Sequence, residues 1–542
     1  MAAPPAPDLP VERPRQPAGA LDGVPGGPVR RAGRRHPPPS LLVPALLTCA
    51  VALVPVGYLV VLAAGSNAGE MVEVLLRPRT RRLLGTTLAL AAVVSAASLV
   101  LGVGSAWLVE RYAFPGRRVF AVLAALPLAV PSYVAAYTWL AAVPAVSGFG
   151  GAALVLTLCC SPYVYLAVAA ALRGLDPAWE EVARSSGCRP WTAFRRVVLP
   201  QLRPAMAAGG LLVATYVLAD FGSVSILRVD TVTRSIATAL DNSFSRLVPT
   251  TLSLLLVAVT ALVVLGEVRS RGRARHARVG GGAARRPSRQ QLAGPGRVLV
   301  PLALGGVALA ALGVPMASLA WWLTVGRSGE WDLPRLGAAA LTSVGYAAGA
   351  AVLTLALALP VGLLAARHPG RPARWVEGLS WLSHAVPAIV VALALVALAV
   401  RHAPALYLGP PLLVLAYALL FLPLAVGAVR ASAVQCPPAL EEVARSLGRG
   451  PRQVLRWVTV PLAAPGIAAG GLLVFLTGMK ELTATLVLHP TGSETLAMRL
   501  WSTTGVGQFA AAAPYAAAIV LLAAVPGWYV SRSAGRSRGR GG

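Results

Sequence analysis

The sequence predicts an all-α integral membrane protein, with about twelve transmembrane helices in two homologous six-helix halves. Of its 542 residues, 56% are hydrophobic and only 13% are charged. The apolar residues gather in runs near the ~20 residues that a helix needs to cross the hydrocarbon core. The runs are continuous and do not alternate over ~10 residues, which argues against a membrane β-barrel. We place the spans near 41–64, 83–109, 119–143, 151–173, 205–228, 249–267, 298–323, 340–366, 378–400, 409–430, 466–488 and 512–530.

Basic residues flank these runs and predict how the chain is oriented. The formal charge is +28, and nine arginines lie between Arg269 and Arg297 alone. Cytoplasmic flanks of membrane proteins carry such an excess. We therefore expect both termini and this linker in the cytoplasm, beside anionic membrane lipid and without nucleic acid as a partner. One loop does not follow this rule, because the twelve-span arrangement places its four arginines outside the cell: Arg77, Arg79, Arg81 and Arg82.

Composition divides the chain into five segments. We expect a disordered basic and Pro-rich cytoplasmic tail at 1–40, a first half at 41–267, a basic cytoplasmic linker at 268–297, a second half at 298–530 and a basic tail at 531–542. The five cysteines show no paired spacing, so neither a disulfide nor a metal site is predicted.

An internal repeat defines the two halves. Glu-Glu-Val-Ala-Arg-Ser starts at Glu180 and recurs at Glu441, so the offset is 441 − 180 = 261. The same offset carries Pro200 onto Pro461. Further upstream, Pro131 matches Pro387 at an offset of 256. An even number of spans separates equivalent points, which predicts parallel halves about a pseudo-two-fold axis along the membrane normal.

The polar segment between the fourth and fifth spans of each half reads as a helix-turn-helix. In the first half, Asp176 is a good N-cap, and Gly187 tolerates a left-handed conformation where the helix stops. A second short helix opens at Pro190 and is expected to end before Pro200. In the second half Pro437 replaces the aspartate, which predicts a weaker cap.

These two segments resemble the signature loop of binding-protein-dependent ABC importer permeases. The matching pattern is Glu-x-Ala-x-x-x-Gly followed, after a fixed spacer, by an aliphatic pair and Pro. It is carried by Glu181, Ala183, Gly187 and Pro200 in the first half and by Glu442, Ala444, Gly448 and Pro461 in the second. The resemblance implies that each loop docks one copy of a cytoplasmic ABC ATPase, so that two copies bind. The alternative is an amphipathic loop helix that rests on the bilayer.

The chain is not expected to be an enzyme, and we predict no catalytic residues and no cofactor in it. A phosphate-binding loop needs a lysine after a Gly-rich turn. The only lysine, Lys480, stands between Met479 and Glu481. ATP and Mg are therefore expected on the partner ATPase.

Charged residues inside spans are expensive and mark a pathway or an internal contact. Asp220 and Glu481 occupy one repeat position, and Lys480 adjoins the second. One interpretation is a translocation path between the halves, with Lys480 partly neutralising one side of it. The other is a structural contact near the helix ends. Both stay open at this point.

The stretch from Lys480 to Pro490 resembles the ferric-iron subgroup of fused permeases. The resemblance implies a multi-pass protein of the bacterial cytoplasmic membrane that receives ferric iron from an extracytoplasmic substrate-binding protein. Thiamine permeases share the fused layout, so thiamine or another small solute remains an alternative. An ion-coupled secondary transporter is a second class, but it gives no reason for two docking motifs.

The linker gives a test of topology. A single cysteine placed within 268–297, with the native cysteines removed, is expected to stay unlabelled by an impermeant thiol reagent in intact cells, because positive charge keeps this segment in the cytoplasm. Labelling should appear once the membrane is permeabilised. Labelling of intact cells would overturn the twelve-span arrangement.

Overall fold

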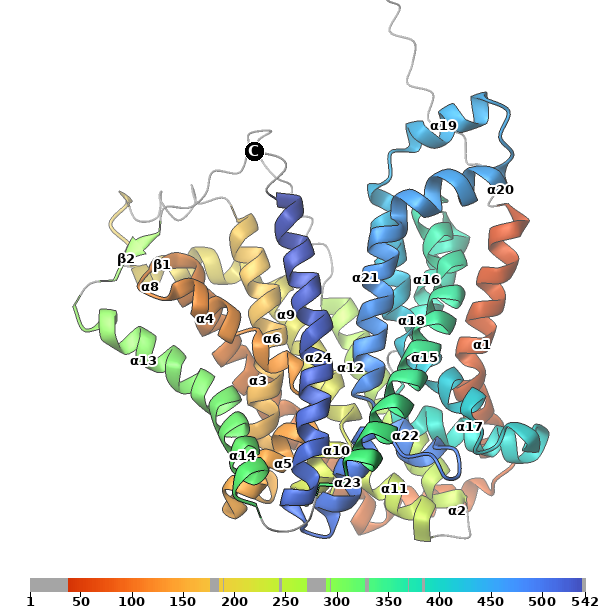
Figure 1. Cartoon of the computed structure of the whole chain (residues 1–542), viewed down its shortest axis with the longest axis horizontal. Helices are drawn as coiled ribbons and strands as arrows, with labels where there is room; N and C mark the ends of the chain where they lie inside the picture. Colours follow the sequence, from red (N-terminus) through yellow and green to blue (C-terminus); the bar gives the residue numbers. More distant parts are fainter. Residues whose placement is uncertain are drawn as a thin grey trace, which may run out of the picture.

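A computed structural model describes residues 38–175, 185–188, 190–242, 246–270, 289–292, 294–326, 331–368, 370–382 and 386–538. The N-terminal tail up to residue 37, most of the linker and the last four residues lie outside these ranges. The described residues form a bundle of long helices that run between two ends of the molecule (Figure 1).

Sequence-equivalent elements recur in order through the two halves. The first half contains α1 (Pro39–Ala64), α2 (Ala68–Leu76), α3 (Pro78–Arg111), β1 (Tyr112–Ala113), α4 (Arg117–Leu123), η1 (Leu126–Ala129), α5 (Ser132–Ala142), η2 (Pro144–Val146), α6 (Phe149–Gly174), α8 (Pro190–Ala193), η3 (Phe194–Val198), α9 (Leu199–Ala219), α10 (Gly222–Ile226), α11 (Val232–Asn242) and α12 (Leu247–Ser270). The second half contains β2 (Gln290–Gln291), α13 (Gly296–Ala308), η4 (Leu309–Gly313), α14 (Val314–Thr324), α15 (Leu333–Arg367), α16 (Arg371–Leu382), α17 (Ala388–His402), η6 (Pro404–Leu406), α18 (Pro410–Gln435), α19 (Pro438–Ser446), α20 (Pro451–Val454), η7 (Leu455–Thr459), α21 (Val460–Met479), α22 (Thr483–Leu488), α23 (Leu496–Gly505) and α24 (Phe509–Arg538).

The helical membrane bundle that the sequence predicts is confirmed, whereas the number twelve stays a prediction. Among the described residues, nine helices are long and apolar enough to cross a membrane. A tenth results if Arg117–Ala129 and Ser132–Ala142, which meet at 98°, count as one span. The predicted spans 378–400 and 512–530 coincide with the shorter apolar helices Ala388–His402 and Phe509–Ala523.

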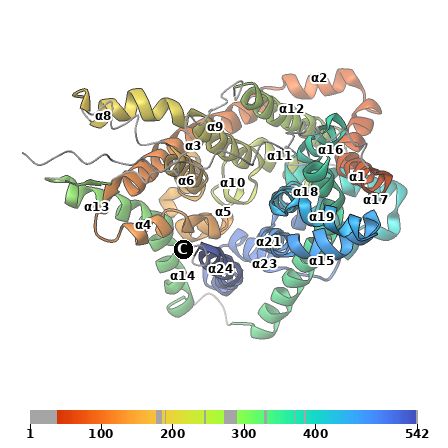
Figure 2. The ribbon, with the colours of Figure 1, turned by 90° about the horizontal axis from the view of Figure 1, so that it is seen from above.

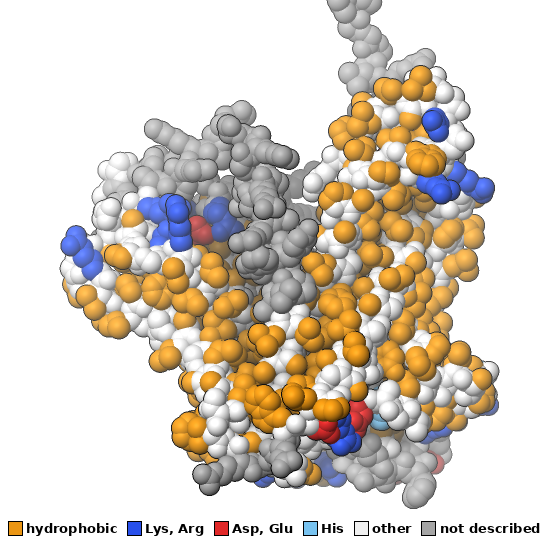
Figure 3. Space-filling model, in the orientation of Figure 1, with side chains coloured by type: hydrophobic (Ala, Val, Ile, Leu, Met, Phe, Trp, Pro, Cys, Tyr) orange, Lys and Arg blue, Asp and Glu red, His pale blue; other side chains and the backbone are white. Residues whose placement is uncertain are grey.

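Helices dominate because a chain in lipid must satisfy its backbone hydrogen bonds internally. Orange hydrophobic side chains cover the middle of the space-filling surface, and charged side chains gather toward its upper and lower ends (Figure 3). The start of α1, the end of α24 and the helix α19 all lie at the upper end in Figure 1. This placement agrees with an even number of crossings and with both flanks on one side of the membrane.

The linker also reaches this upper end. Its described part forms β2, which pairs in parallel with β1, Gln290 beside Tyr112 and Gln291 beside Ala113. The short strand pair attaches the end of the linker to the turn between α3 and α4.

The two halves exchange helices, which the repeat alone does not reveal. One buried cluster joins α3, α5, α6 and α9 of the first half with side chains of α14, α23 and α24 of the second. The other joins α15, α17 and α18 of the second half with side chains of α1, α11 and α12 of the first. Seen from above, α1 lies beside α16 and α17, and α14 lies on the opposite side of the molecule (Figure 2). Each spatial lobe therefore contains helices of both predicted segments, 41–267 and 298–530.

Small residues allow the helices inside each lobe to approach closely. A Cβ atom placed on Gly102 of α3 would lie 2.6 Å from Cβ of Val164 and 2.9 Å from the backbone oxygen of Ser161, both in α6. By contrast, a Cβ on Gly104, two residues further along α3, meets nothing within 4 Å. Close backbone approach at small residues is the usual basis of helix packing in membranes.

Substitution of these two glycines tests the packing. Gly102→Val is expected to destabilise the protein by ~1–3 kcal/mol, the usual effect of overpacking, because α3 must move away from α6. Gly104→Val is the matched control and should leave stability unchanged. Thermal melting of the purified protein in detergent measures both. Equal melting temperatures for the two variants would contradict the close contact.

Candidate functional site

The second predicted docking loop forms a helix-turn-helix that projects from the upper end of the bundle. The helix α19 begins after Pro437, which supplies no side-chain cap, as the sequence predicts. It ends in a left-handed turn at Gly448, where φ is +80°. The amide of Gly448 donates to the Arg445 oxygen at 3.0 Å, and that of Arg449 donates to the Ala444 oxygen at 3.1 Å. This pair of bonds is the Schellman motif, which satisfies carbonyls at a helix end.

A buried carboxylate holds α19 against the bundle. Glu441, which is 7% exposed, lies 2.7 Å from Nη2 of Arg367 at the end of α15 and 3.1 Å from Nη2 of Arg445. It also accepts a hydrogen bond from Thr459 Oγ1 at 2.9 Å. Arg367 donates further to the Cys436 oxygen at 3.2 Å. The loop is therefore attached to both α15 and η7.

Sequence reasoning missed this anchor because it followed the second glutamate of the pair. Glu442 is exposed, whereas Glu441 is buried. The available signal was Arg367, which corresponds to Arg111 at the 256-residue offset, the last residue of α3. An arginine at the end of both long helices, before a duplicated Glu-Glu, indicates a charged anchor in each half. Glu180, its counterpart in the first half, lies outside the described residues.

The outer face of α19 carries exposed apolar side chains. Leu440, Val443 and Leu447 follow the i, i+3, i+7 spacing of one helix face. Their exposed fractions are 45%, 56% and 78%. Ala444, on the adjoining side of the helix, is buried, as is Glu441. Exposed apolar side chains gathered on one face mark an interaction surface.

The first docking loop is described only in part. Gly187 adopts a left-handed φ of +82°, which agrees with the predicted helix end. The motif residues Glu181 and Ala183 lie outside the described residues. Their role therefore stays a prediction.

The prediction that the second loop helix ends before Pro200 is wrong. Phe194–Ala219 is one continuous helix that passes through Pro200, and Pro451–Met479 likewise passes through Pro461. In both halves five residues in π-helical conformation, η3 and η7, precede the proline. A proline ring crowds the carbonyl four residues earlier, here that of Arg196 or Trp457. Since both lie in the wider π-turn, the helix continues.

Asp220 lies at a break between helices and not inside a span. The helix α9 ends at Ala219, and the carboxylate of Asp220 reaches over the start of α10. Its Oδ2 accepts from the Val224 amide at 3.2 Å and from the Ser223 hydroxyl. Its Oδ1 accepts from Ser132 Oγ of α5 at 2.8 Å. The carboxylate therefore holds α5 and α10 together.

Glu481 occupies the equivalent break after α21. Its Oε1 accepts from the Ala484 amide at 2.9 Å, at the start of α22. Lys480 forms no ion pair with it, and the predicted partial neutralisation stays a prediction. Lys480 Nζ instead donates to the Leu128 oxygen of the first half at 3.3 Å. The lysine therefore links the two halves at this level.

The two breaks lie close together where the halves meet. A Cβ on Gly222 would lie 2.8 Å from the Tyr133 Cβ and 3.0 Å from Cδ2 of Leu482, which belongs to the other half. The rings of Phe221 and Trp501 pack across the same seam at 5.2 Å. In Figure 1 the helices α10, α22 and α23 lie toward the end opposite α19. The acids are thus remote from the docking loops.

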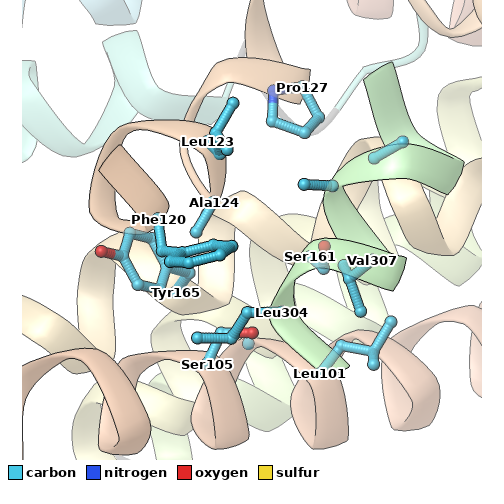
Figure 4. Close-up of a pocket in the computed structure, with 13 residues that line it drawn as sticks. Leu101, Ser105, Phe120, Leu123, Ala124, Pro127, Ser161, Tyr165, Leu304 and Val307 are labelled. Atoms are coloured by element: carbon cyan, nitrogen blue, oxygen red, sulfur yellow. The ribbon is translucent and has the colours of Figure 1, made fainter. Parts of the chain in front are cut away.

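A small cavity elsewhere is not a substrate site. Figure 4 shows it between α3, α4 and α6 of the first half and the exchanged α13–η4. Its volume is about 20 Å³, the size of a water molecule. Its lining is mostly apolar, and its hydroxyls come from Ser105, Ser161 and Tyr165. The cavity belongs to the seam formed by helix exchange.

The repeated helical bundle with its projecting loop defines a class, the transport permeases of two fused halves. A family model described as "binding-protein-dependent transport system inner membrane component" matches residues 98–268 and 358–534. The chain belongs to this family and is a multi-pass protein of the cytoplasmic membrane.

Relatives cover the chain to different extents. The chain is 36% identical over 494 residues to the Fe(3+)-transport system permease protein FbpB 2 of Haemophilus influenzae, which covers 91% of this chain and 98% of that protein. It is 34% identical over 201 residues to the sulfate transport system permease protein CysT of Escherichia coli, which covers 34% of this chain and 72% of that protein. Similarity to the iron permease thus extends through both halves.

Substitution of the paired glutamates tests the anchor. Glu441→Gln is expected to weaken the attachment of α19 by up to ~3 kcal/mol, because it removes a buried carboxylate and leaves Arg367, whose side chain is 15% exposed, without its counter-charge. Glu442→Gln, the matched control, changes an exposed side chain and should have little effect. Hydrogen exchange of the α19 amides reports the difference. If exchange is equally slow in both variants, Glu441 does not anchor the loop.

Proposed function

We propose that the chain is the transmembrane subunit of an ABC importer for ferric iron. Two cytoplasmic ATPase subunits would dock on its two loops, and an extracytoplasmic binding protein would deliver the substrate. The observation that carries the proposal is α19, a helix held rigidly by Glu441 that presents Leu440, Val443 and Leu447 outward. A rigid helix with an apolar face can transmit motion between a partner and the bundle.

ATP hydrolysis belongs to the partner in this proposal. The single lysine of the sequence, Lys480, is used at the seam between the halves, far from a Gly-rich turn. ATP and Mg would bind the ATPase subunits, and the permease would be no enzyme. An ion-coupled secondary transporter, the alternative class, gives no role to two equivalent docking loops.

Ferric iron is favoured as the substrate by the extent of the resemblance. The Fe(3+) permease matches 91% of this chain, whereas the sulfate permease matches 34% of it. No observation favours thiamine. The translocation path in this proposal passes between the halves at the two helix breaks and is bordered by Asp220, Lys480 and Glu481.

Reconstitution tests the function. The permease, its ATPase and its binding protein, assembled in liposomes, should hydrolyse ATP faster when the binding protein carries ferric iron, and radiolabelled iron should accumulate. Empty binding protein is the control. If thiamine or sulfate, and not iron, stimulates ATP hydrolysis, the substrate assignment is wrong. Transport without ATP, driven by an ion gradient, would overturn the class.

The docking loops are tested in the same preparation. Arg in place of Glu181 and Gly187, or of Glu442 and Gly448, should weaken assembly at one loop each, because bulky charge enters a packed surface and Gly448 has a φ that side chains rarely adopt. Combining all four changes should abolish recovery of the ATPase on the permease. Undiminished recovery with the fourfold variant would reject docking at these loops.

A further inference from the structure

The two acids at the helix breaks occupy one repeat position but have different surroundings. Two hydroxyls, from Ser132 and Ser223, donate to Asp220, and Ser132 in turn accepts from Tyr216 at 2.9 Å. Among the described residues, by contrast, no side chain donates to Glu481, whose carboxylate accepts only backbone amides at the start of α22. The carboxylate of Asp220 is therefore occupied by hydrogen bonds that hold the fold, whereas the carboxylate of Glu481 can accept further hydrogen bonds.

Two tyrosines, one from each half, lie near the turn that carries Glu481. Tyr417 of α18 shares a hydrogen bond with Thr485, and the hydroxyl of Thr485 also donates to the Glu481 backbone oxygen at 2.7 Å. Tyr133 of α5 comes from the first half and packs at Gly222, the same point that Leu482 reaches. Hydroxyl-bearing side chains from both halves thus lie at the turn that carries Glu481.

The hydroxyl of Tyr133 is buried without a hydrogen-bond partner among the described residues. The residue is 4% exposed. An unsatisfied buried polar group typically destabilises a protein by ~1–3 kcal/mol, so it calls for an explanation. Because this hydroxyl stands near a carboxylate that has spare acceptor capacity, a group that binds both would relieve the deficit.

The internal repeat allows the residues near Glu481 to be compared with the corresponding residues near Asp220. At the offsets of 256 and 261, Tyr133, Tyr417 and Thr485 correspond to Ile389, Leu156 and Val224. The break at Asp220 thus has apolar side chains at the three positions that correspond to these hydroxyl-bearing residues, and its own hydroxyls, from Ser132 and Ser223, bind Asp220 itself. Helix packing at the equivalent break therefore does not require hydroxyl groups at these three positions.

We propose that Glu481, Tyr133 and the Tyr417–Thr485 hydroxyl pair form an oxygen-lined transit site for the transported cation, while Asp220 is a positioning residue for α10. This inference rests on the proposed function. It replaces a symmetric pair of acids on the path with one acid that meets the substrate and one that supports the turn.

The chemistry of the site suits a hard cation that passes through. Carboxylate, phenol and hydroxyl oxygens are the ligands that hard, highly charged cations prefer. The described residues contain no group of three or more His, Cys, Asp or Glu side chains that could hold a metal ion. A single carboxylate with neutral oxygens binds more weakly than such a cluster, and conduction requires that the ion can also leave.

Two substitutions test the site against two controls. Glu481→Gln should lower the rate of radiolabelled iron uptake at least about tenfold, the change that ~1.4 kcal/mol produces. Its melting temperature should stay the same, because glutamine still accepts from the Ala484 amide. Asp220→Asn should instead lower the melting temperature, because it disrupts the links to Ser132 and Ser223. Equal uptake by Glu481→Gln and the wild type would overturn the proposal.

Tyr133→Phe gives the sharper test, because it removes only a hydroxyl that has no partner and should leave the protein as stable as before. Its uptake per folded molecule should fall. The control is Tyr137→Phe on the same helix, whose hydroxyl donates to the Phe509 oxygen at 2.6 Å. This control should melt at a lower temperature but transport normally once corrected for folded protein. Normal transport by Tyr133→Phe would also reject the site.

The assay uses the assembled permease, ATPase and iron-loaded binding protein in liposomes. If the wild-type protein transports no iron when ATP is present, the proposed function fails independently of the variants. If the wild type moves iron and both Glu481→Gln and Tyr133→Phe match it, the transit site fails and the proposed function stands. The two failures are therefore distinguishable in one set of measurements.

Discussion

The requirement that backbone groups be satisfied within the bilayer shapes this protein, because every interruption of a helix then needs side chains to replace the missing bonds. The breaks after α9 and α21 show two solutions. At the first, Asp220 takes backbone and hydroxyl donors and joins α5 to α10. At the second, Glu481 takes backbone donors alone. The difference leaves one carboxylate available for a further contact.

The same requirement explains how the docking loops join the bundle. The prolines that follow each loop do not end the helix, since a π-turn before each proline accommodates its ring. The loop therefore continues directly into α9 or α21, whose other end carries Asp220 or Glu481. A force on the second loop, which Glu441 fixes to α15, can thus reach a helix break along one rigid element. The proposed coupling between the loop and the seam would therefore follow one continuous helix.

Helix exchange connects the halves beyond the seam. Because α1 packs with the second half and α14 with the first, neither lobe can separate without breaking apolar contacts of the other. Motion between the lobes is then restricted to changes that keep these helices in place. The link from Lys480 to the Leu128 oxygen adds a polar contact at the level of the acids.

Local patterns in the sequence determined much of this protein's architecture. Apolar runs predict the bundle, the 261-residue offset predicts equivalent halves, and the glycines at 187 and 448 predict left-handed turns, because each feature depends on neighbouring residues alone. Only the tertiary structure decided which helices exchange, which glutamate of the pair is buried, and where Lys480 donates. These outcomes depend on groups that are far apart in the chain, such as Arg367 with Glu441 and Lys480 with Leu128. No spacing within one segment can encode contacts that only packing brings together.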